Sequence, residues 1–169
     1  MVNGISLDKL ELDMNKAGAF GNWEKLNERI DFDIVKQVSE KGESCVSAVG
    51  QMLMESRNIA VTQAEILAII GEPASIESLR WCLNRLDVSE SDKRWYAGYQ
   101  FDVDSMLSKR NFAVTLKEFG GQSHAVFVKE FINGRFIIND TFDQSYYEMT
   151  KESFNEVWTG GYIFYGEDK

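Results

Sequence analysis

The chain has 169 residues, which suits one domain and is too short for two of ordinary size. Hydrophobic residues make up 44% of it and aromatic residues 12%, which excludes a disordered acidic tail, because such tails are poor in aromatic residues. The 27 acidic residues outnumber the 18 lysines and arginines, so the formal net charge is −9. An acidic surface repels phosphate and anionic lipid, and we therefore expect neither nucleic acid nor a membrane surface as a partner.

Targeting and disulfide signals are also missing from the sequence. No stretch approaches the roughly 18 consecutive apolar residues of a membrane-spanning helix, and residues 1–13 do not have the pattern of a signal peptide. The two cysteines, Cys45 and Cys82, are too few for a disulfide framework. We therefore expect free thiols in a reducing compartment.

The N-terminal part of the chain differs from the rest. A loose apolar stripe over residues 7–14 is interrupted by two glycines. A second set of apolar residues then recurs with helical spacing: Trp23, Leu26 and Ile30. This pattern predicts a short helix, a break and a second short helix. We accordingly divide the chain into an N-terminal extension, residues 1–36, and a domain, residues 37–169.

Three helices are predicted next, because apolar residues recur at intervals of three and four. The first helix begins at Cys45. The second begins at Thr62 and Glu65, which have the spacing of a capping box, and it ends at Gly71. The third begins after Ser75, a residue type that caps helices well.

The second half of the domain reads as strands, because the apolar period falls from about 3.6 to 2 residues. The expected strands are residues 112–117, 125–132, 135–140, 146–149 and 162–165, with turns at Asn133–Gly134 and Gly160–Gly161 and a short helix after Thr150. Helices followed by an antiparallel sheet are typical of an α+β domain.

The chain contains one histidine, His124, and a single imidazole cannot build a multi-histidine metal site. The carboxylates do not have the spacing of a metal loop, and no CxxC motif is present. Gly120–Gly121 lacks the spacing of a phosphate-binding loop. We therefore expect no metal and no cofactor.

Nucleophilic catalysis by Cys45 is the chemistry that remains. The N-terminal end of a helix favours a thiolate, and a nearby imidazolium favours it further. His124 opens one predicted strand, while Asn139 and Asp140 end the strand that returns beside it. The sequence thus offers a nucleophile, a base and a residue that orients the base, as in cysteine acyl-transfer enzymes.

The residue that orients His124 is left open by the strand register. A two-residue turn pairs Val128 with Asn139, which places Asn139 on the face of His124. A bulge would place Asp140 there instead. Either side chain can orient an imidazole, so both remain candidates.

An oxyanion donor is also required, and two groups can supply it. They are the backbone N–H of Cys45 and the side chain of Gln37, whereas Gln51 lies nearly two helical turns further on and is the poorer choice. A buried cysteine is more often a small apolar core residue than a nucleophile. We expect that role for Cys82, which shares a helical stripe with leucines.

Several short segments together resemble a known family. In chain order they are SCVSA (44–48), VTQAEI (61–66), PAS (73–75), HAVFV (124–128), ND (139–140), MTKESF (149–154) and VWTG (157–160). With these segments, residues 37–165 resemble the papain-like peptidases that cleave double-glycine leader peptides in bacteriocin-exporting transporters. They resemble more closely the papain-fold domains at the C-termini of bacterial polymorphic toxins.

The resemblance implies a papain-like α+β fold, in which N-terminal helices pack on a C-terminal antiparallel sheet, and a cysteine protease or amidase activity. It makes Cys45 the nucleophile, His124 the general base and acid, and Asp140 the residue that orients His124. Gln37 would bind the oxyanion.

The sequence departs from the family pattern at three places. Val46 and Ser47 follow the cysteine where the family usually has a glycine, and Thr141 follows the aspartate where the family usually has proline. Gln37 lies about two residues further from Cys45 than is usual in the family, which makes its role the least secure.

The leader peptidases are fused to membrane transporters, so the absence of a predicted membrane segment favours the toxin-like relatives. They imply an effector domain that is delivered within a larger secreted bacterial protein and acts in the cytoplasm on a protein or peptide. A cognate immunity protein would be its partner. Deamidation or amide transfer would use the same nucleophile. The alternatives are a papain-fold binding module without chemistry and a domain that regulates a larger parent protein.

Overall fold

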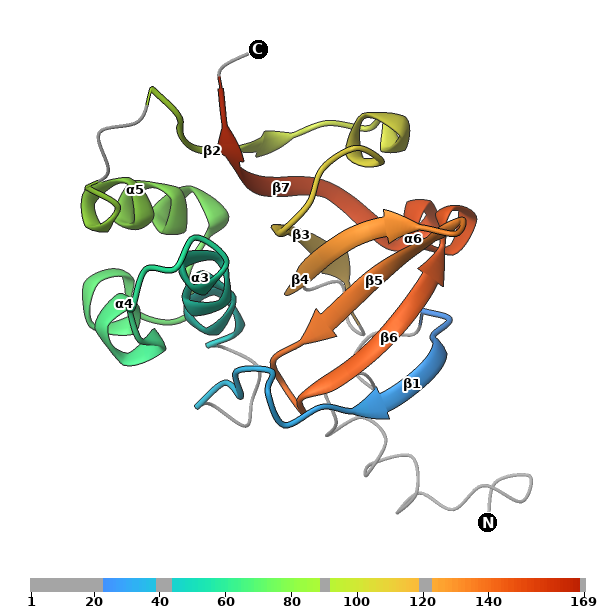
Figure 1. Cartoon of the computed structure of the whole chain (residues 1–169), viewed down its shortest axis with the longest axis horizontal. Coiled ribbons are helices and arrows are strands. Elements are labelled where there is room, and N and C mark those ends of the chain that lie inside the picture. Colours follow the sequence, from blue (N-terminus) through green and yellow to red (C-terminus); the bar gives the residue numbers. More distant parts are fainter. Residues whose placement is uncertain (1–22, 39–43, 89–91, 119–122, 168–169) are drawn as a thin grey trace.

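The computed structural model describes residues 23–38, 44–88, 92–118 and 123–167, and the structural statements in this article concern these residues. They form one antiparallel sheet with the strand order β1-β6-β5-β4-β3-β7-β2. In Figure 1 the helices within residues 45–86 lie together beside the sheet, and the helix of residues 151–157 lies at its far end. The predicted α+β class, with helices packed on an antiparallel sheet, is confirmed.

The helices are α3 (Cys45–Glu55), α4 (Gln63–Ile70), α5 (Ile76–Leu86) and α6 (Lys151–Val157), with a 3₁₀ turn, η1 (Val103–Met106). The strands are β1 (Leu26–Ile30), β2 (Arg94–Tyr99), β3 (Phe112–Lys117), β4 (Ser123–Ile132), β5 (Arg135–Asp140), β6 (Ser145–Thr150) and β7 (Trp158–Gly166). None of the helices in the described part of the chain has the length and apolar character needed to cross a membrane.

The predicted starts of α4 and α5 are confirmed by their capping contacts. The Thr62 hydroxyl accepts a hydrogen bond from the Glu65 backbone, and the Glu65 carboxylate accepts one from the Thr62 backbone. The Ser75 hydroxyl accepts a hydrogen bond from the Ser78 N–H at the start of α5. Gly71 ends α4 with a φ of +73°, which glycine adopts at little cost.

The helix predicted over residues 23–30 is wrong, because this segment is extended and forms β1 at the edge of the sheet. β1 pairs with β6, and its register shifts between Leu26 and Arg29, so the segment shows no two-residue alternation. Trp23 is buried nonetheless. Part of the predicted N-terminal extension is therefore built into the sheet. The helix expected at residues 7–14 lies outside the described residues.

The turn predicted at Gly160–Gly161 is also wrong, because both glycines lie inside β7, which begins at Trp158. Gly160 has a φ of +95°, and its carbonyl accepts a hydrogen bond from the Gln100 N–H at 2.9 Å. These glycines mark a close approach of two backbone segments rather than a reversal of the chain. The strand β2, which the sequence analysis did not predict, pairs with β7 along this edge.

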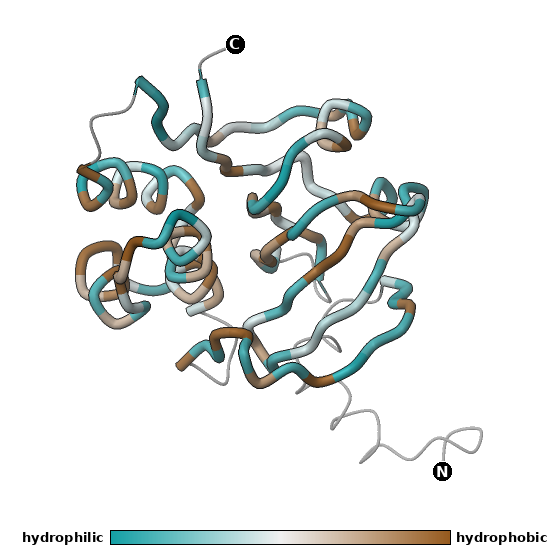
Figure 2. Tube along the Cα trace, in the orientation of Figure 1, coloured by the Kyte–Doolittle hydropathy of each residue, from teal (hydrophilic) through white to brown (hydrophobic). Residues whose placement is uncertain are grey.

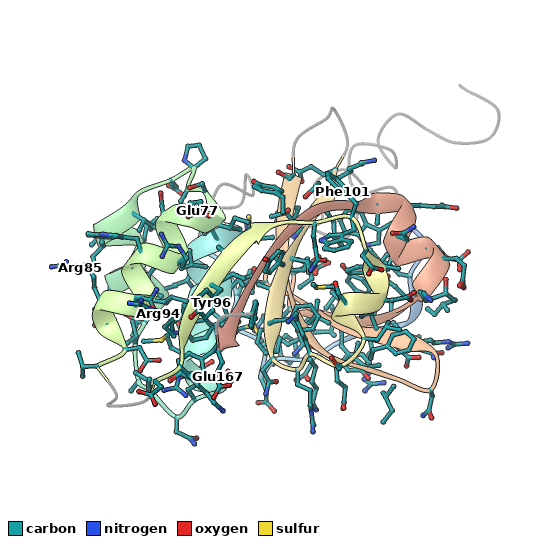
Figure 3. All side chains as sticks on the ribbon, turned by 90° about the horizontal axis from the view of Figure 1, so that it is seen from above. Glu77, Arg85, Arg94, Tyr96, Phe101 and Glu167 are labelled. Atoms are coloured by element: carbon teal, nitrogen blue, oxygen red, sulfur yellow. The ribbon has the colours of Figure 1, made fainter. Side chains whose placement is uncertain are left out.

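The core has two parts, one on each side of the sheet. Between the helices and the sheet, Val49 and Leu53 of α3 pack with Leu79 of α5, Phe127 of β4 and other apolar side chains. A second cluster on the other face is formed by Phe112, Val114, Leu116, Val126, Phe136, Phe154 and their neighbours. Figure 2 shows apolar residues along the middle strands and on the helices, and in Figure 3 side chains fill the space between these layers.

Gly160 and Gly134 allow a matched test of this close approach, since both have a positive φ. A Cβ at Gly160 would lie 2.6 Å from the Gln100 carbonyl oxygen, whereas a Cβ at Gly134 meets nothing within 4 Å. Gly134→Ala should lower the free energy of unfolding by about 1–2 kcal/mol. Gly160→Ala should lower the free energy of unfolding by roughly 1–3 kcal/mol more than that, because its methyl group would also clash with the Gln100 carbonyl oxygen. Urea denaturation measures both, and equal losses would contradict the close approach.

Candidate active site

Cys45 is the first residue of α3 and is buried. The carbonyl of Ser44 begins the helix by accepting hydrogen bonds from the Ala48 N–H and the Ser47 hydroxyl. The first turn carries no acidic side chain, so no carboxylate opposes the positive end of the helix dipole. The sequence therefore places a thiol where the backbone favours a negative charge.

His124 lies next to Cys45 and Asp140, which come from two different elements. Its Nε2 lies 2.8 Å from Oδ1 of Asp140, at the end of β5. The Cys45 side chain lies near enough to the imidazole to help raise its pKa. Because Nε2 faces the carboxylate, Nδ1 is the nitrogen that faces the thiol. Only 2% of His124 and none of Asp140 is exposed.

The register between β4 and β5 decides which side chain reaches His124. The pairing shifts by one residue after the turn, so that Phe127 rather than Val128 stands opposite Asn139. Because side chains alternate along a strand, Asp140 then shares the face of His124. The structure therefore brings Asp140 to the imidazole and turns Asn139 to the other face.

The hydrogen-bond pair holds both of its members in the charged form. Burial by itself would lower the pKa of His124, but the charge and hydrogen bond of Asp140, together with Cys45, raise it well above its usual value. Burial would raise the pKa of Asp140, but the charge and hydrogen bond of His124 lower it, with help from Lys25 and the Phe142 N–H. An imidazolium facing a thiol is the arrangement that activates a cysteine nucleophile.

Gln37 lies at the same end of β5 and is almost fully buried. Its backbone N–H donates to the Thr141 carbonyl at 2.7 Å, and its Oε1 accepts a hydrogen bond from the Thr141 hydroxyl at 3.2 Å. Since the oxygen of the amide faces Thr141, the NH₂ group is directed away from Thr141. Thr141, which departs from the family pattern, thus orients the side chain that the sequence analysis assigned to the oxyanion.

The backbone on both sides of Gln37 is held by one further side chain. The Gln63 amide at the start of α4 donates to the Lys36 carbonyl and accepts a hydrogen bond from the Val38 N–H. The backbone N–H of Gln63 in turn donates to Gln51 Oε1 at 2.7 Å. Gln51 therefore supports the start of α4.

Three residues beside the site had no assigned role in the sequence analysis. Trp23 stacks on His124, with ring centroids 6.4 Å apart and an interplanar angle of 18°. The Tyr147 hydroxyl lies 3.3 Å from Oδ2 of Asp140. Burial raises the pKa of Glu118, which follows β3 and lies near this pair. Thr141 also had no assigned role, and its departure from the family pattern was the sequence signal that could have found it.

The remaining predictions concern metal sites and the second cysteine. Within the described ranges, no group of three or more His, Cys, Asp or Glu side chains is arranged to hold a metal ion. Both cysteines are free. Cys82 is fully buried in the cluster between the helices and the sheet, and burial raises the pKa of its thiol. Its predicted role as a core residue is confirmed.

The chain is similar in sequence to a bacterial effector. No established family model matches it. Cysteine protease effector 1 of Escherichia coli O1:K1:H7 is 33% identical to it over 155 residues, which cover 88% of this chain and 30% of the effector. The chain therefore spans less than a third of the length of this curated relative.

Solved peptidase domains have a similar structure. The peptidase domain of Streptococcus ComA, a bifunctional ABC transporter involved in quorum sensing, has a TM-score of 0.64 and 18% identity, covering 79% of this chain and 97% of that domain. A double-glycine motif protease from an AMS/PCAT transporter, solved with its leader peptide, has a TM-score of 0.63 and 12% identity, covering 88% and 97%. The chain therefore has the papain-like cysteine peptidase fold of the double-glycine peptidase domains, as its sequence predicted.

Proposed function

We propose that this chain is a cysteine peptidase-like hydrolase domain of a bacterial effector and that Cys45, His124 and Asp140 are its catalytic triad. The observation that carries the proposal is the buried hydrogen bond between His124 and Asp140 beside the Cys45 thiol, which lies at the start of α3. The similarity to a cysteine protease effector and the shared peptidase fold support it.

The first half of the reaction is acylation of Cys45. Its thiolate attacks the carbonyl carbon of an amide, and the negative charge moves to the carbonyl oxygen. The His124 imidazolium gives its proton to the leaving nitrogen as the C–N bond breaks, which leaves a thioester and a neutral imidazole. Asp140 keeps the imidazole in the orientation that this transfer requires.

The second half is hydrolysis of the thioester. His124 takes a proton from water, and the hydroxide attacks the acyl carbon. The C–S bond then breaks, so the thiolate and the imidazolium are restored and the acid product leaves. The Cys45 backbone N–H and the NH₂ group of Gln37 are the proposed donors to the oxyanion in both halves. The orientation of Gln37 by Thr141 supports this role.

The substrate in this proposal is a protein or a peptide. One neighbour of similar fold was solved with a leader peptide, and the similar curated protein is named an effector. An effector domain of this kind would be delivered within a longer bacterial protein, act in the cytoplasm and be neutralised by a cognate immunity protein. The same nucleophile would serve a deamidase or an amide transferase, and the products of the reaction distinguish these activities.

The activity can be tested on a bacterial cell extract in water enriched in oxygen-18. Peptide-bond hydrolysis should give new C-termini that carry the heavy isotope, whereas deamidation would convert Asn or Gln within uncut chains. Mass spectrometry reads both. The products should disappear in Cys45→Ala and persist in Cys82→Ala. Identical products from the wild-type protein and Cys45→Ala would overturn the proposal.

The oxyanion role of Gln37 can be tested on the extract protein that is cleaved fastest. Gln37→Ala should lower kcat by roughly 10²–10³-fold, as loss of an oxyanion donor does. Thr141→Val keeps the shape of the side chain but removes its hydroxyl, and it should lower kcat about tenfold because the amide is less well held. Asn84→Ala, in a helix that contributes no residue to the site, is the control. A kcat for Gln37→Ala equal to that of the control would exclude the role.

The charged His124–Asp140 pair also predicts a pH dependence of stability. The pKa of His124 is higher in the folded protein than its ordinary value of 6.5 in the unfolded chain. Protonated His124 therefore stabilises the fold fully below pH 6.5, and this stabilisation is lost as the pH rises through the pKa of the folded protein. The pKa of Asp140 is lower in the folded protein than its ordinary value of 3.8. Ionised Asp140 therefore stabilises the fold above pH 3.8, and this stabilisation is lost as the pH falls through the pKa of the folded protein. In urea unfolding, the free energy of unfolding of the wild-type protein should therefore exceed that of Asp140→Asn by most between pH 3.8 and pH 6.5. An advantage that does not change with pH would argue against a charged pair.

A further inference from the structure

The residues just before β1 contact the His124–Asp140 pair, although the sequence analysis placed them in an extension outside the domain. The Trp23 indole lies against one face of the His124 imidazole, and both rings are nearly inaccessible to water. The indole therefore keeps solvent away from that face of the imidazole and limits the tilt of its ring.

The direction of the hydrogen bond between Trp23 and Tyr147 is fixed, because an indole has a donor and no acceptor. Its Nε1–H can only donate, and it donates to the Tyr147 hydroxyl at 3.1 Å. The hydroxyl proton of Tyr147 must then point elsewhere, and Oδ2 of Asp140 lies 3.3 Å away. Tyr147 is fully buried, so no water competes for this proton.

Asp140 is consequently held through both of its oxygens. Oδ1 lies 2.8 Å from His124 Nε2 and accepts a hydrogen bond from the Phe142 N–H at 3.2 Å, while Oδ2 accepts one from Tyr147. A carboxylate bonded at both oxygens cannot rotate away from the imidazole. The line of donors from Trp23 through Tyr147 therefore fixes the plane in which Asp140 meets His124.

Lys25 adds a positive charge to the same cluster. Its Nζ lies 5.2 Å from the centre of the Trp23 ring and 5.0 Å from that of Tyr147, and its side chain is 9% exposed. Burial lowers the pKa of Lys25, while the nearby charges of Asp140, Glu28 and Asp143 act in the opposite direction. The ammonium group in turn helps to keep Asp140 ionised.

From these contacts we infer that the segment 23–25 completes the active site and that Trp23 and Tyr147 are positioning residues for the His124–Asp140 pair. The inference rests on the proposed function, since it concerns the same triad. The active site would then include residues upstream of Gln37, the first residue of the segment that resembles the family. The segment acts through Asp140 and His124 and has no part in the bond-breaking steps.

The test is the rate at which iodoacetamide alkylates Cys45 as a function of pH, read by mass spectrometry, with Cys82 in the same sample as an internal reference. In the wild-type protein, Cys45 should react at about pH 6, where an ordinary thiol is almost unreactive. Tyr147→Phe removes the hydrogen bond to Asp140 and should lower this rate about tenfold. Trp23→Phe keeps an aromatic ring over His124 but removes the donor, and it should lower the rate about threefold.

Trp95→Phe is the matched control for both variants. Trp95 is also a buried tryptophan, and its Nε1–H donates to Asp87 Oδ2 at 3.1 Å. It lies on β2, at the edge of the sheet opposite β1. This substitution should reduce stability in a similar way and leave the pH profile of Cys45 unchanged. Circular dichroism establishes that each variant is folded, and either site variant alone is sufficient for the test.

The results separate failure of this inference from failure of the proposed function. If His124→Ala leaves the low-pH reactivity of Cys45 intact, the thiol is not paired with the imidazole, and the proposed triad and the inference both fail. If His124→Ala abolishes that reactivity while Trp23→Phe and Tyr147→Phe behave like Trp95→Phe, the triad stands and the positioning role is overturned.

Discussion

The buried hydrogen bond between His124 and Asp140 is the interaction on which the rest of this site depends. An isolated imidazolium or carboxylate with so little exposure would be unstable in its charged form. Each group removes that penalty for the other, and the bond fixes the imidazole so that its second nitrogen faces Cys45. A charged base in a dry interior follows from this single contact, and the proposed chemistry requires both the charge and the orientation.

The fold supplies the members of the site from the helix α3 and from the paired strands β4 and β5. The helix α3 presents Cys45 at its first residue, and the packing of α3 on β4 places that helix end beside the sheet. Neighbouring strands supply His124 near the start of β4 and Asp140 at the end of β5. The core on the helical face therefore holds the nucleophile in place relative to its base.

Two segments that precede α3 complete the surroundings of the pair. Gln37 is held at its side chain by Thr141 and at its neighbours by Gln63, so a residue with unusual spacing still reaches the end of β5. Trp23 approaches from the other face and closes the imidazole off from solvent. Thr141, which departs from the family pattern, thus makes a side-chain contact that holds Gln37 at the end of β5.

The sequence by itself determined the features that depend on local signals. The start of α3 at Cys45 and the capping of α4 follow from spacing and cap chemistry within a few residues, and a single histidine restricts the chemistry to one imidazole. The tertiary structure decided the rest. Asp140 rather than Asn139 faces His124 because a one-residue shift in pairing reverses the faces of a strand. Trp23 contacts Tyr147 across 124 positions, and a contact between segments so far apart leaves no periodicity in either one.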